Sequence, residues 1–190
     1  MEEKRFNPKN LHKLNDPKRL QNIPPTLIIE KAQLTNPKTM LDFGTGTALF
    51  PRAFIDIFPQ LKAYACDIAP EMIQWIEKEV KPHYPNITPI KLENYRIPLP
   101  DNSIDFIIML NVFHELDDVM ETLNECKRVM KPKGKFILSD WRKEETPKGP
   151  SYDIRVDVDI ATEQIEKTEM TIIEEIPNDL PNNYLIIAEK

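Results

Sequence analysis

The sequence predicts an α/β fold: a seven-stranded, mostly parallel sheet with helices on both faces and an antiparallel hairpin at the C-terminus. Two observations predict this fold. Short apolar runs alternate with amphipathic helical stretches between Thr39 and Trp141, as in a series of strand-helix units. Beyond them, the strand-like runs Met170–Ile176 and Tyr184–Glu189 are joined by PNDLPNN, a link too short for a crossover helix, so these two strands must be antiparallel.

The chain begins with a polar, proline-bearing lead-in over residues 1–25. Its scattered leucines give only a weak amphipathic stretch. Pro24 and Pro25 can open a helix over Thr26–Leu34, because proline is well tolerated in the first helical turn. We expect the lead-in to cover the active site of a single domain that spans residues 1–190, since this length supports one well-buried core.

The strands and helices of the sheet follow in alternation. The run IDFIIML is continuously apolar, which is typical of a strand covered on both faces. Lys133 and Gly134 predict a turn. The predicted strands are Thr39–Phe43, Ala63–Cys66 with Asp67 at its end, Thr88–Leu92, Ile104–Leu110 and Lys135–Trp141. The predicted helices are Leu49–Phe58, Pro70–Val80, Asp117–Met130 and Asp157–Thr168.

Charge, cysteine pattern and hydropathy argue against a nucleic-acid partner, a metal site and a membrane span. The net charge is -6 and no long basic block occurs, which disfavours a nucleic-acid partner. Cys66 and Cys126 stand in no metal-binding pattern, so we interpret both as reduced thiols and expect no metal. The charged N-terminus MEEKRFNPKN and the lack of any long apolar stretch predict a cytoplasmic protein without a membrane span.

The segment most indicative of a binding site is the glycine turn that runs from Asp42 to Ala48 directly after the first strand. Ligands of wound α/β sheets bind where strands end and helices begin. Gly44 and Gly46 allow the backbone to turn sharply and a ligand to approach closely. A turn of this kind alone is as consistent with a purely structural role.

Two further acids at predicted strand ends point to a nucleoside. Asp67 ends the second strand, where a carboxylate can accept both hydroxyls of a ribose. Glu93 follows the third strand, where an acceptor can meet an exocyclic amine. Each acid taken alone could simply cap a helix or pair with a lysine. Together with Asp42, they describe a site for a nucleoside that carries a cationic group.

A nicotinamide cofactor is the main rival, because its sites also use a glycine turn and an acid after the second strand. The dinucleotide pattern requires a third glycine at the position of Leu49. In addition, Asp42 would place negative charge close to a pyrophosphate. A sulfonium cofactor with a free amino group fits these residues better.

Three motifs stand out between Leu41 and Trp141: LDFGTGTALF, ACDIAPEMI and IPLPDNSIDFIIMLNVFHEL. Together they resemble the class I S-adenosylmethionine-dependent methyltransferases of the small-molecule type, including those of quinone biosynthesis. LDFGTGTALF resembles the first motif of that family, and ACDIAPEMI resembles its second strand and the following helix. IPLPDNSIDFIIMLNVFHEL is similar to its fourth-strand segment. The resemblance implies a Rossmann-like sheet, S-adenosylmethionine as the cofactor and S-adenosylhomocysteine as the product.

The resemblance also implies roles for individual residues. Gly44, Gly46 and the acid Asp42 would line the methionine end of the cofactor. Asp67 would bind the ribose hydroxyls, and Ile68 would cover one face of the adenine. Many members of the family have glycine where this chain has Ala48, and the extra methyl group should be tolerated if that position mainly packs helix against strand.

Further residues would meet the adenine and the methionine amine. Glu93, with Asn94 beside it, would accept from the adenine amino group, and Asn111 would meet the methionine amine through its backbone. Met72, at helical spacing, is in the first place a core residue. The full set of predicted cofactor-binding residues is Asp42, Gly44, Thr45, Gly46, Asp67, Ile68, Met72, Glu93, Asn94 and Asn111.

On the acceptor side the sequence leaves alternatives open. His114 follows the fourth strand and is a candidate general base, although it could equally orient the loop or pack. Asp140 and Tyr152 are further candidates for the acceptor pocket. We expect methyl transfer to a small-molecule acceptor. The alternatives are a non-catalytic subunit that binds S-adenosylmethionine and, less favoured, a nicotinamide-dependent oxidoreductase.

Overall fold

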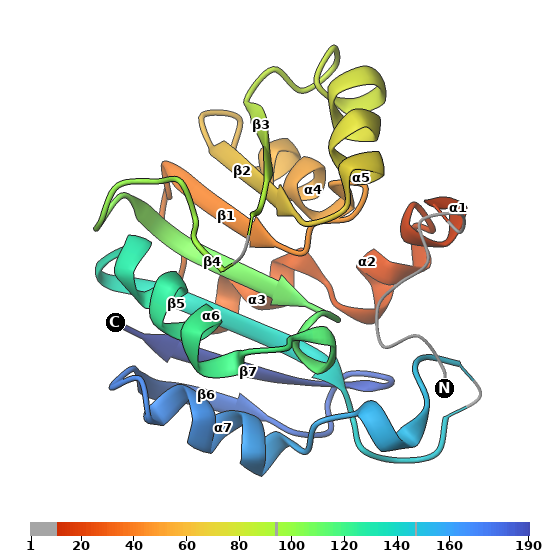
Figure 1. Ribbon diagram of the computed structural model, residues 1–190, viewed down its shortest axis with the longest axis vertical. Coiled ribbons are helices and arrows are strands. Elements are labelled where there is room, and N and C mark those ends of the chain that lie inside the picture. The colour runs from red at the N-terminus through yellow and green to blue at the C-terminus, as the bar shows by residue number, and fades with distance from the viewer. Residues whose placement is uncertain (1–10, 94, 147) are drawn as a thin grey trace.

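The computed structural model describes residues 11–93, 95–146 and 148–190. Its centre is a seven-stranded sheet with the strand order β3-β2-β1-β4-β5-β7-β6 (Figure 1). All neighbours from β3 to β5 pair in parallel, whereas β7 pairs antiparallel with both β5 and β6. The predicted sheet with its C-terminal hairpin is therefore confirmed. The strands are β1 (Thr39–Phe43), β2 (Lys62–Asp67), β3 (Ile87–Lys91), β4 (Ile104–Leu110), β5 (Met130–Trp141), β6 (Thr171–Ile176) and β7 (Asn183–Glu189).

Helices cover both faces of the sheet, as predicted, with α6 and α7 on the near side of Figure 1. The opposite face is covered by α3, α4 and α5 with its continuation η2. Two short helices, α1 and α2, precede them. The helices are α1 (Leu11–Leu14), α2 (Lys18–Asn22), α3 (Pro25–Lys31), α4 (Leu49–Ile57), α5 (Pro70–Trp75), the π-helix η2 (Ile76–Val80), α6 (Val119–Val129) and α7 (Val158–Glu166), with short 3₁₀ turns η3 (Phe113–Glu115) and η4 (Tyr152–Ile154).

The continuous apolar run of β4 has the predicted cause. Phe106 and Ile108 lie in the core beneath α3 and α4, whereas Ile107 between them lies in the core beneath α6 and α7. All three side chains are fully buried. Phe54 of α4 packs on Phe106 with 5.3 Å between ring centroids. Because successive strand residues point to opposite faces, a strand with two covered faces needs apolar residues at both parities.

The predicted turn at Lys133 and Gly134 lies inside β5, because the strand begins earlier than expected, at Met130. The pairing of β5 with β4 shifts register between Ile104 and Phe106, and Lys133 has a left-handed φ of 63°. A Cβ on Gly134 would come within 2.8 Å of the carbonyl oxygen of Lys131. The two residues thus form a bulge that bends a continuing strand.

Two other features bear on the predictions from sequence. Cys66 and Cys126 are both buried and free of disulfides. No helix within residues 11–93, 95–146 and 148–190 is long and apolar enough to cross a membrane.

Candidate functional site

The strand order reverses between β1 and β4, because the chain passes from β1 to β2 and β3 on one side and then returns to β4 on the other. The carboxyl ends of β1, β2, β4 and β5 lie along one edge of the sheet. Ligands of open α/β sheets bind at this edge, next to the point of reversal. The glycine turn that follows β1 lies there.

Gly44 packs directly against the loop after β4. Its φ is 72°, and a Cβ built on it would lie 2.4 Å from Cγ2 of Val112. Such a contact is impossible for a side chain, and the left-handed backbone is itself unfavourable for any residue with a Cβ. Glycine is required here for conformation and for close approach, as predicted, although the partner Val112 could not be read from the sequence.

The turn is fastened to β2 through its backbone N–H groups. Those of Gly44 and Thr45 both donate to the carbonyl oxygen of Cys66 at 2.9 Å. The N–H of Gly46 donates to Oδ2 of Asp67 at 2.8 Å. Asp67 also accepts from the N–H of Ala69 at 2.9 Å, so its carboxyl group is held in one orientation at the end of β2.

Asp42 and Asp67 are both buried at this turn, with 3% and 8% of their surface exposed. Burial raises the pKa of Asp42 to about 7, although a hydrogen bond from Thr45 Oγ1 at 2.7 Å and the nearby charge of Arg19 lower it. Burial also raises the pKa of Asp67, against the hydrogen bonds from Ala69 and Gly46. A cation placed between these acids would favour their ionised forms. The pair therefore suits a positively charged ligand.

Arg19 of α2 is part of the site and was not predicted. Its Nη1 donates to the carbonyl oxygen of Leu14 at 2.9 Å, and its guanidinium lies 5.5 Å from the ring centroid of Phe50. Burial lowers the pKa of Arg19, while the charge of Asp42 raises it. Helical periodicity carries no information about a pairing between a lead-in residue and β1, so no signal in the sequence identified it.

The lead-in contacts the glycine turn at two more points. A Cβ on Gly46 would lie 2.9 Å from Cδ1 of Leu14, so the leucine side chain packs on the turn itself. Nη2 of Arg52 in α4 donates to Oδ1 of Asn15 at 2.9 Å. Figure 1 shows α1 and α2 at the sheet edge to which the arrow of β4 points. Residues 11–22 thus lie against the turn, and residues 1–10 of the predicted covering segment are outside the described residues.

Ala48 adopts a left-handed conformation, with φ 56° and ψ 36°, immediately before α4. The sequence predicted only a packing role for this position. Its side chain is fully buried, which agrees with packing. The backbone adds a conformational cost of about 1–2 kcal/mol for a residue with a Cβ. A glycine at this position has a reason beyond packing.

The residues predicted around the adenine differ in their exposure to solvent. Ile68 follows Asp67 and is 45% exposed, whereas Met72 is buried in α5. Glu93 lies two residues beyond the end of β3, in an isolated bridge with Arg96. Its side chain is 81% exposed and pairs with Lys91 at 3.6 Å, so it faces solvent rather than the buried acids. Asn94 is outside the described residues.

Asn111 directly follows β4 and has a left-handed φ of 61°. Its N–H donates to the carbonyl oxygen of Ser139 at 2.8 Å, and its Oδ1 accepts from Nδ2 of Asn183 at 2.6 Å. The side chain is thereby fixed toward β5 and β7. This arrangement is compatible with the predicted use of its backbone, rather than its side chain, toward a ligand.

His114 and Asp140 form a buried pair across the ends of β4 and β5. Nδ1 of His114 lies 2.8 Å from Oδ1 of Asp140, and the N–H of His114 donates to Oδ2 at 3.0 Å. The two residues are 6% and 1% exposed. Tyr152, the third candidate, lies on η4 with 44% of its surface exposed and Nζ of Lys143 5.6 Å from its ring centroid. The structure therefore brings two of the three candidates together.

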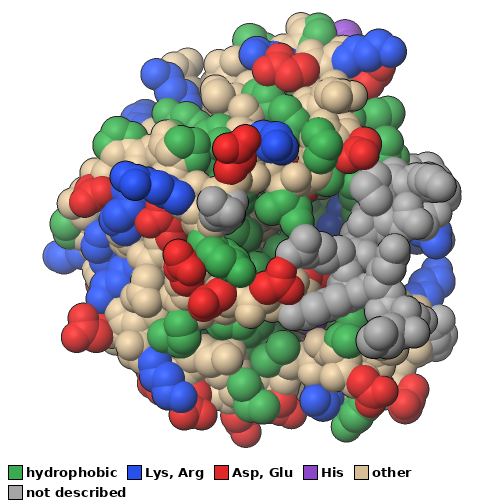
Figure 2. Space-filling view, in the orientation of Figure 1, with side chains coloured by type: hydrophobic (Ala, Val, Ile, Leu, Met, Phe, Trp, Pro, Cys, Tyr) green, Lys and Arg blue, Asp and Glu red, His purple; other side chains and the backbone are tan. Residues whose placement is uncertain are grey.

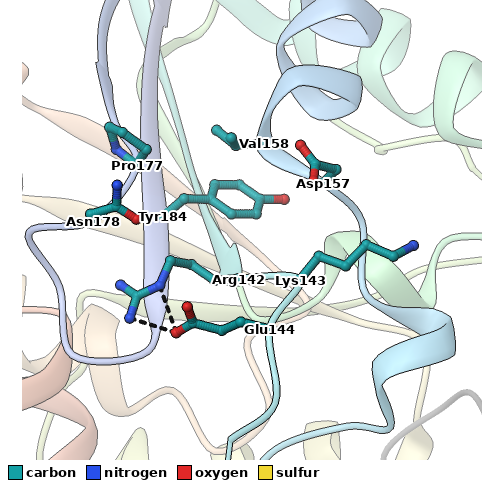
Figure 3. Close-up of a pocket in the computed structure, with 8 residues that line it drawn as sticks. All are labelled: Arg142, Lys143, Glu144, Asp157, Val158, Pro177, Asn178 and Tyr184. Atoms are coloured by element: carbon teal, nitrogen blue, oxygen red, sulfur yellow. Dashed lines mark hydrogen bonds and ion pairs between the residues drawn. The ribbon is translucent and has the colours of Figure 1, made fainter.

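A cavity of about 180 Å³ lies farther along the same edge, beyond the end of β5. Figure 3 shows the ring of Tyr184 reaching across it, with the hydroxyl directed toward the side of Asp157. This hydroxyl is buried and has no hydrogen-bond partner among the described residues. The residues lining the cavity are Arg142, Lys143, Glu144, Asp157, Val158, Pro177, Asn178 and Tyr184.

Charge on the surface is mixed. Lys and Arg side chains are interleaved with Asp and Glu over the visible face (Figure 2). Within the described parts of the chain, no group of three or more His, Cys, Asp or Glu side chains is arranged to hold a metal ion.

Comparison with known proteins places this geometry in context. The family profile described as a methyltransferase domain matches residues 41–138. The crystal structure of a S-adenosylmethionine-dependent methyltransferase from Aquifex aeolicus superimposes with a TM-score of 0.90 at 31% identity, covering 97% of this chain and 99% of that one.

Curated sequences give a similar result over shorter stretches. A malonyl-[acyl-carrier protein] O-methyltransferase from Methylococcus capsulatus is 29% identical over 105 residues, which are 55% of this chain and 38% of that protein. A demethylmenaquinone methyltransferase from Thermotoga maritima is 29% identical over 111 residues, 58% of this chain and 47% of that protein. This chain therefore spans less than half the length of these two relatives.

Proposed function

Since the chain belongs to the S-adenosylmethionine-dependent methyltransferases, we propose that it transfers the sulfonium methyl group of this cofactor to a small-molecule acceptor. The cofactor supplies the reactive methyl group. The chain binds and orients the two reactants and excludes water, which is enough to accelerate a direct transfer.

The pair of buried acids at the glycine turn carries this proposal. Asp42 and Asp67 stand at the ends of adjacent strands, and burial raises the pKa of both. Arg19 offsets only part of the cost of burying these acids, because burial still raises the pKa of Asp42 to about 7. S-adenosylmethionine brings a sulfonium and an amino group without any phosphate, so its charge matches the donor set of the site.

We assign the cofactor contacts to the residues gathered at this turn. Asp42, Thr45 and the backbone at Gly44 and Gly46 would hold the methionine end, and Asp67 would bind the ribose through the carboxylate lone pairs that Gly46 and Ala69 leave available. Ile68, which is 45% exposed, would cover the adenine. The remaining assignments, Met72, Glu93, Asn94 and the backbone of Asn111, rest on the resemblance in sequence; for Glu93, reaching the adenine would require its exposed side chain to turn inward.

For the acceptor we propose only that it is a small molecule. The two curated relatives are named for different acceptors, one a carrier-bound malonyl group and the other a demethylmenaquinone. The cavity of about 180 Å³ beyond β5 is smaller than most ligand pockets, which measure about 300–1,000 Å³, so it would admit only a small ring or a short chain. We propose that residues 1–190 act as one domain in the cytoplasm, with the lead-in as part of the wall of the site.

Calorimetry with S-adenosylhomocysteine and with NADH tests the cofactor assignment. We expect binding of S-adenosylhomocysteine, no binding of NADH, and at least a tenfold loss of affinity in Asp67→Ala. Glu71→Ala, which removes an exposed acid four residues away, is the matched control and should bind as the wild type does. Binding of NADH alone would indicate an oxidoreductase and refute the proposal.

A second experiment tests turnover. The protein is incubated with a metabolite extract and S-adenosylmethionine that carries a labelled methyl group, and labelled products are identified by mass spectrometry. We expect a labelled small molecule that is absent with Asp67→Ala. Tight binding of S-adenosylhomocysteine without any labelled product would instead support a non-catalytic binding subunit.

A further inference from the structure

We propose that His114, oriented by Asp140, is the general base of the reaction and that the acceptor is therefore a hydroxyl compound with an acidic O–H, such as a phenol. This inference rests on the proposed function and narrows the class of its acceptor. Its basis is the order of the glycine turn, the His114–Asp140 pair and the cavity along the sheet edge, together with the hydrogen bonds of the pair.

The pair lies between the cofactor turn and the cavity. The sheet order is β2, β1, β4, β5, β7; Asp42 lies one residue before the end of β1, and Asp67 ends β2. His114 follows β4 and Asp140 lies at the end of β5, while the cavity is lined by Tyr184 of β7, the residue paired with Asp140. Val112, two residues before His114, touches the glycine turn at Gly44. A base between the site of the methyl donor and the site of the methyl acceptor can reach the proton that the acceptor loses.

The hydrogen bonds fix the tautomer of His114. Asp140 accepts from the N–H groups of His114 and Trp141, at 3.0 Å and 2.6 Å, and faces Nδ1 of His114 at 2.8 Å. The oxygen Oδ1 that already accepts from the N–H of Trp141 is the one that faces Nδ1, so it is placed to accept a hydrogen bond from Nδ1 as well. Nδ1 must therefore carry the hydrogen, which leaves the lone pair of the neutral imidazole on Nε2. This tautomer is the one that accepts a proton at Nε2.

Two carboxyl groups lie near the ring and would face the imidazolium that results. Asp140 faces the ring from β5, and Oε1 of Glu115 in η3 lies 3.8 Å from Nε2. From β7, the phenol of Tyr184 lies beside Asp140 and is neutral, because burial raises its pKa well above 10. Lys143 lines the cavity and would supply a cation to an acceptor that becomes anionic there.

In the proposed step, Nε2 of His114 takes the hydroxyl proton as the acceptor oxygen bonds to the methyl carbon. The bond from that carbon to sulfur breaks, and its electron pair stays on sulfur. The products are a methyl ether, a neutral thioether and an imidazolium that faces Asp140. A hydroxyl needs such a base because it is a poor nucleophile until it loses its proton, whereas a carboxylate acceptor is already ionised at neutral pH.

The test uses 4-nitrophenol, whose ionised form alone absorbs visible light, with protein saturated by S-adenosylhomocysteine. At a pH where the free phenol is mostly protonated, binding to the wild type should produce the band of the phenolate. His114→Gln should reduce this band at least tenfold, and Asp140→Asn should weaken it because the imidazolium loses its counter-charge. His83→Gln, an exposed histidine, is the matched control and should leave the band unchanged.

Failure of this proposal is separable from failure of the proposed function. If the wild type does not bind S-adenosylhomocysteine, both fall. If it binds S-adenosylhomocysteine but 4-nitrophenol does not bind, binds without the band, or gives an equal band with His114→Gln, only the assignment of the base and acceptor falls. Should His114→Gln lose S-adenosylhomocysteine binding through misfolding, Asp140→Asn decides, and an unchanged band in that variant overturns the proposal.

Discussion

Gly44 and Val112 touch so closely that a Cβ on Gly44 would lie 2.4 Å from Cγ2 and 2.7 Å from Cγ1 of the valine. This contact joins the turn after β1 to the loop after β4 at the point where the strand order reverses. It fixes the distance between the glycine turn and the loop that carries His114.

We predict that Gly44→Ala lowers the free energy of unfolding by about 2–4 kcal/mol, through a left-handed alanine and an overpacked contact. Adding Val112→Ala should recover about 1 kcal/mol of this loss, since the smaller side chain relieves the crowding but not the backbone strain. Denaturant unfolding of both single variants and the double variant measures the coupling. If the losses of the two single variants simply add in the double variant, crowding against Val112 is not the cause of the destabilisation by Gly44→Ala.

The pKa of about 7 for Asp42 predicts how pH affects the ligand-free protein. The folded state keeps this proton up to about pH 7, whereas the unfolded chain releases it near 3.8, so Asp42 increasingly destabilises the fold as pH rises from 3.8 to about 7. Asp42→Asn removes the charge, so its melting temperature should exceed that of the wild type at pH 8, with a smaller difference at pH 5.

The control for this measurement is Asp179→Asn, at an exposed loop position. It should show no difference that changes in this way with pH. A constant gap between Asp42→Asn and the wild type from pH 5 to pH 8 would show that Asp42 is already ionised at the lower pH.

We predict that Arg19 sets the pH at which the acids of the glycine turn become fully charged. Its positive charge lowers the pKa of Asp42, so Arg19→Met should raise that pKa further. Because a cationic ligand favours ionised Asp42, the affinity for S-adenosylmethionine should rise with pH near 7, and the midpoint of this rise should move to higher pH in Arg19→Met.

Calorimetry at a series of pH values measures this shift. Lys18→Met removes an exposed cation from the same helix and should leave the midpoint where it is in the wild type. Equal shifts in the two variants would attribute the effect to net charge rather than to the position of Arg19.

Arg155 should hold the loop that borders the cavity. It is 4% exposed, and its Nη1 donates to the carbonyl oxygens of Arg142 and Glu144 at 3.1 Å and 2.7 Å, while Nε and Nη2 donate to that of Pro150 at 3.0 Å and 2.8 Å. Arg155→Met should cost about 2 kcal/mol of stability, because these bonds come from a charged group and their loss leaves carbonyl groups unpaired.

The loss should be local. Hydrogen exchange should speed up over residues 142–150, with the affinity for S-adenosylhomocysteine within twofold of the wild type. Lys148→Met, an exposed position of the same loop, is the control. A matching loss of cofactor affinity in Arg155→Met would mean that the loop supports the glycine turn as well.

The elements of the fold could be predicted because their signals are local. The apolar run of β4 predicts a strand covered on both faces, and the glycines after β1 predict a tight turn. The end of β3 was placed one residue late, and Glu93 is exposed rather than turned inward. The predicted strand began at Thr88 instead of Ile87, since an edge strand with one partner gives a weak apolar pattern.

The contacts that complete the site could not be predicted, because they join residues distant in sequence. Arg19 approaches Asp42 from the lead-in, and Asp140 reaches His114 across two strand ends. Each residue had an equally good local interpretation as a surface cation, a strand-end acid or a packed histidine. The strand order brings Asp140 to His114, and the packing of α2 against the glycine turn brings Arg19 to Asp42.

The hydrogen bonds that fasten the glycine turn to β2 also bear on which nucleotides this turn would bind. Phosphate groups bind at such turns through free backbone N–H groups. Here those of Gly44 and Thr45 already donate to Cys66, and that of Gly46 donates to Asp67. ATP and NADH, which are abundant competitors, would meet a turn with these donors engaged and two acids nearby. Their phosphates would lose hydrogen bonds to water and gain none from the turn, so we expect weak binding of both even without a side chain that blocks them.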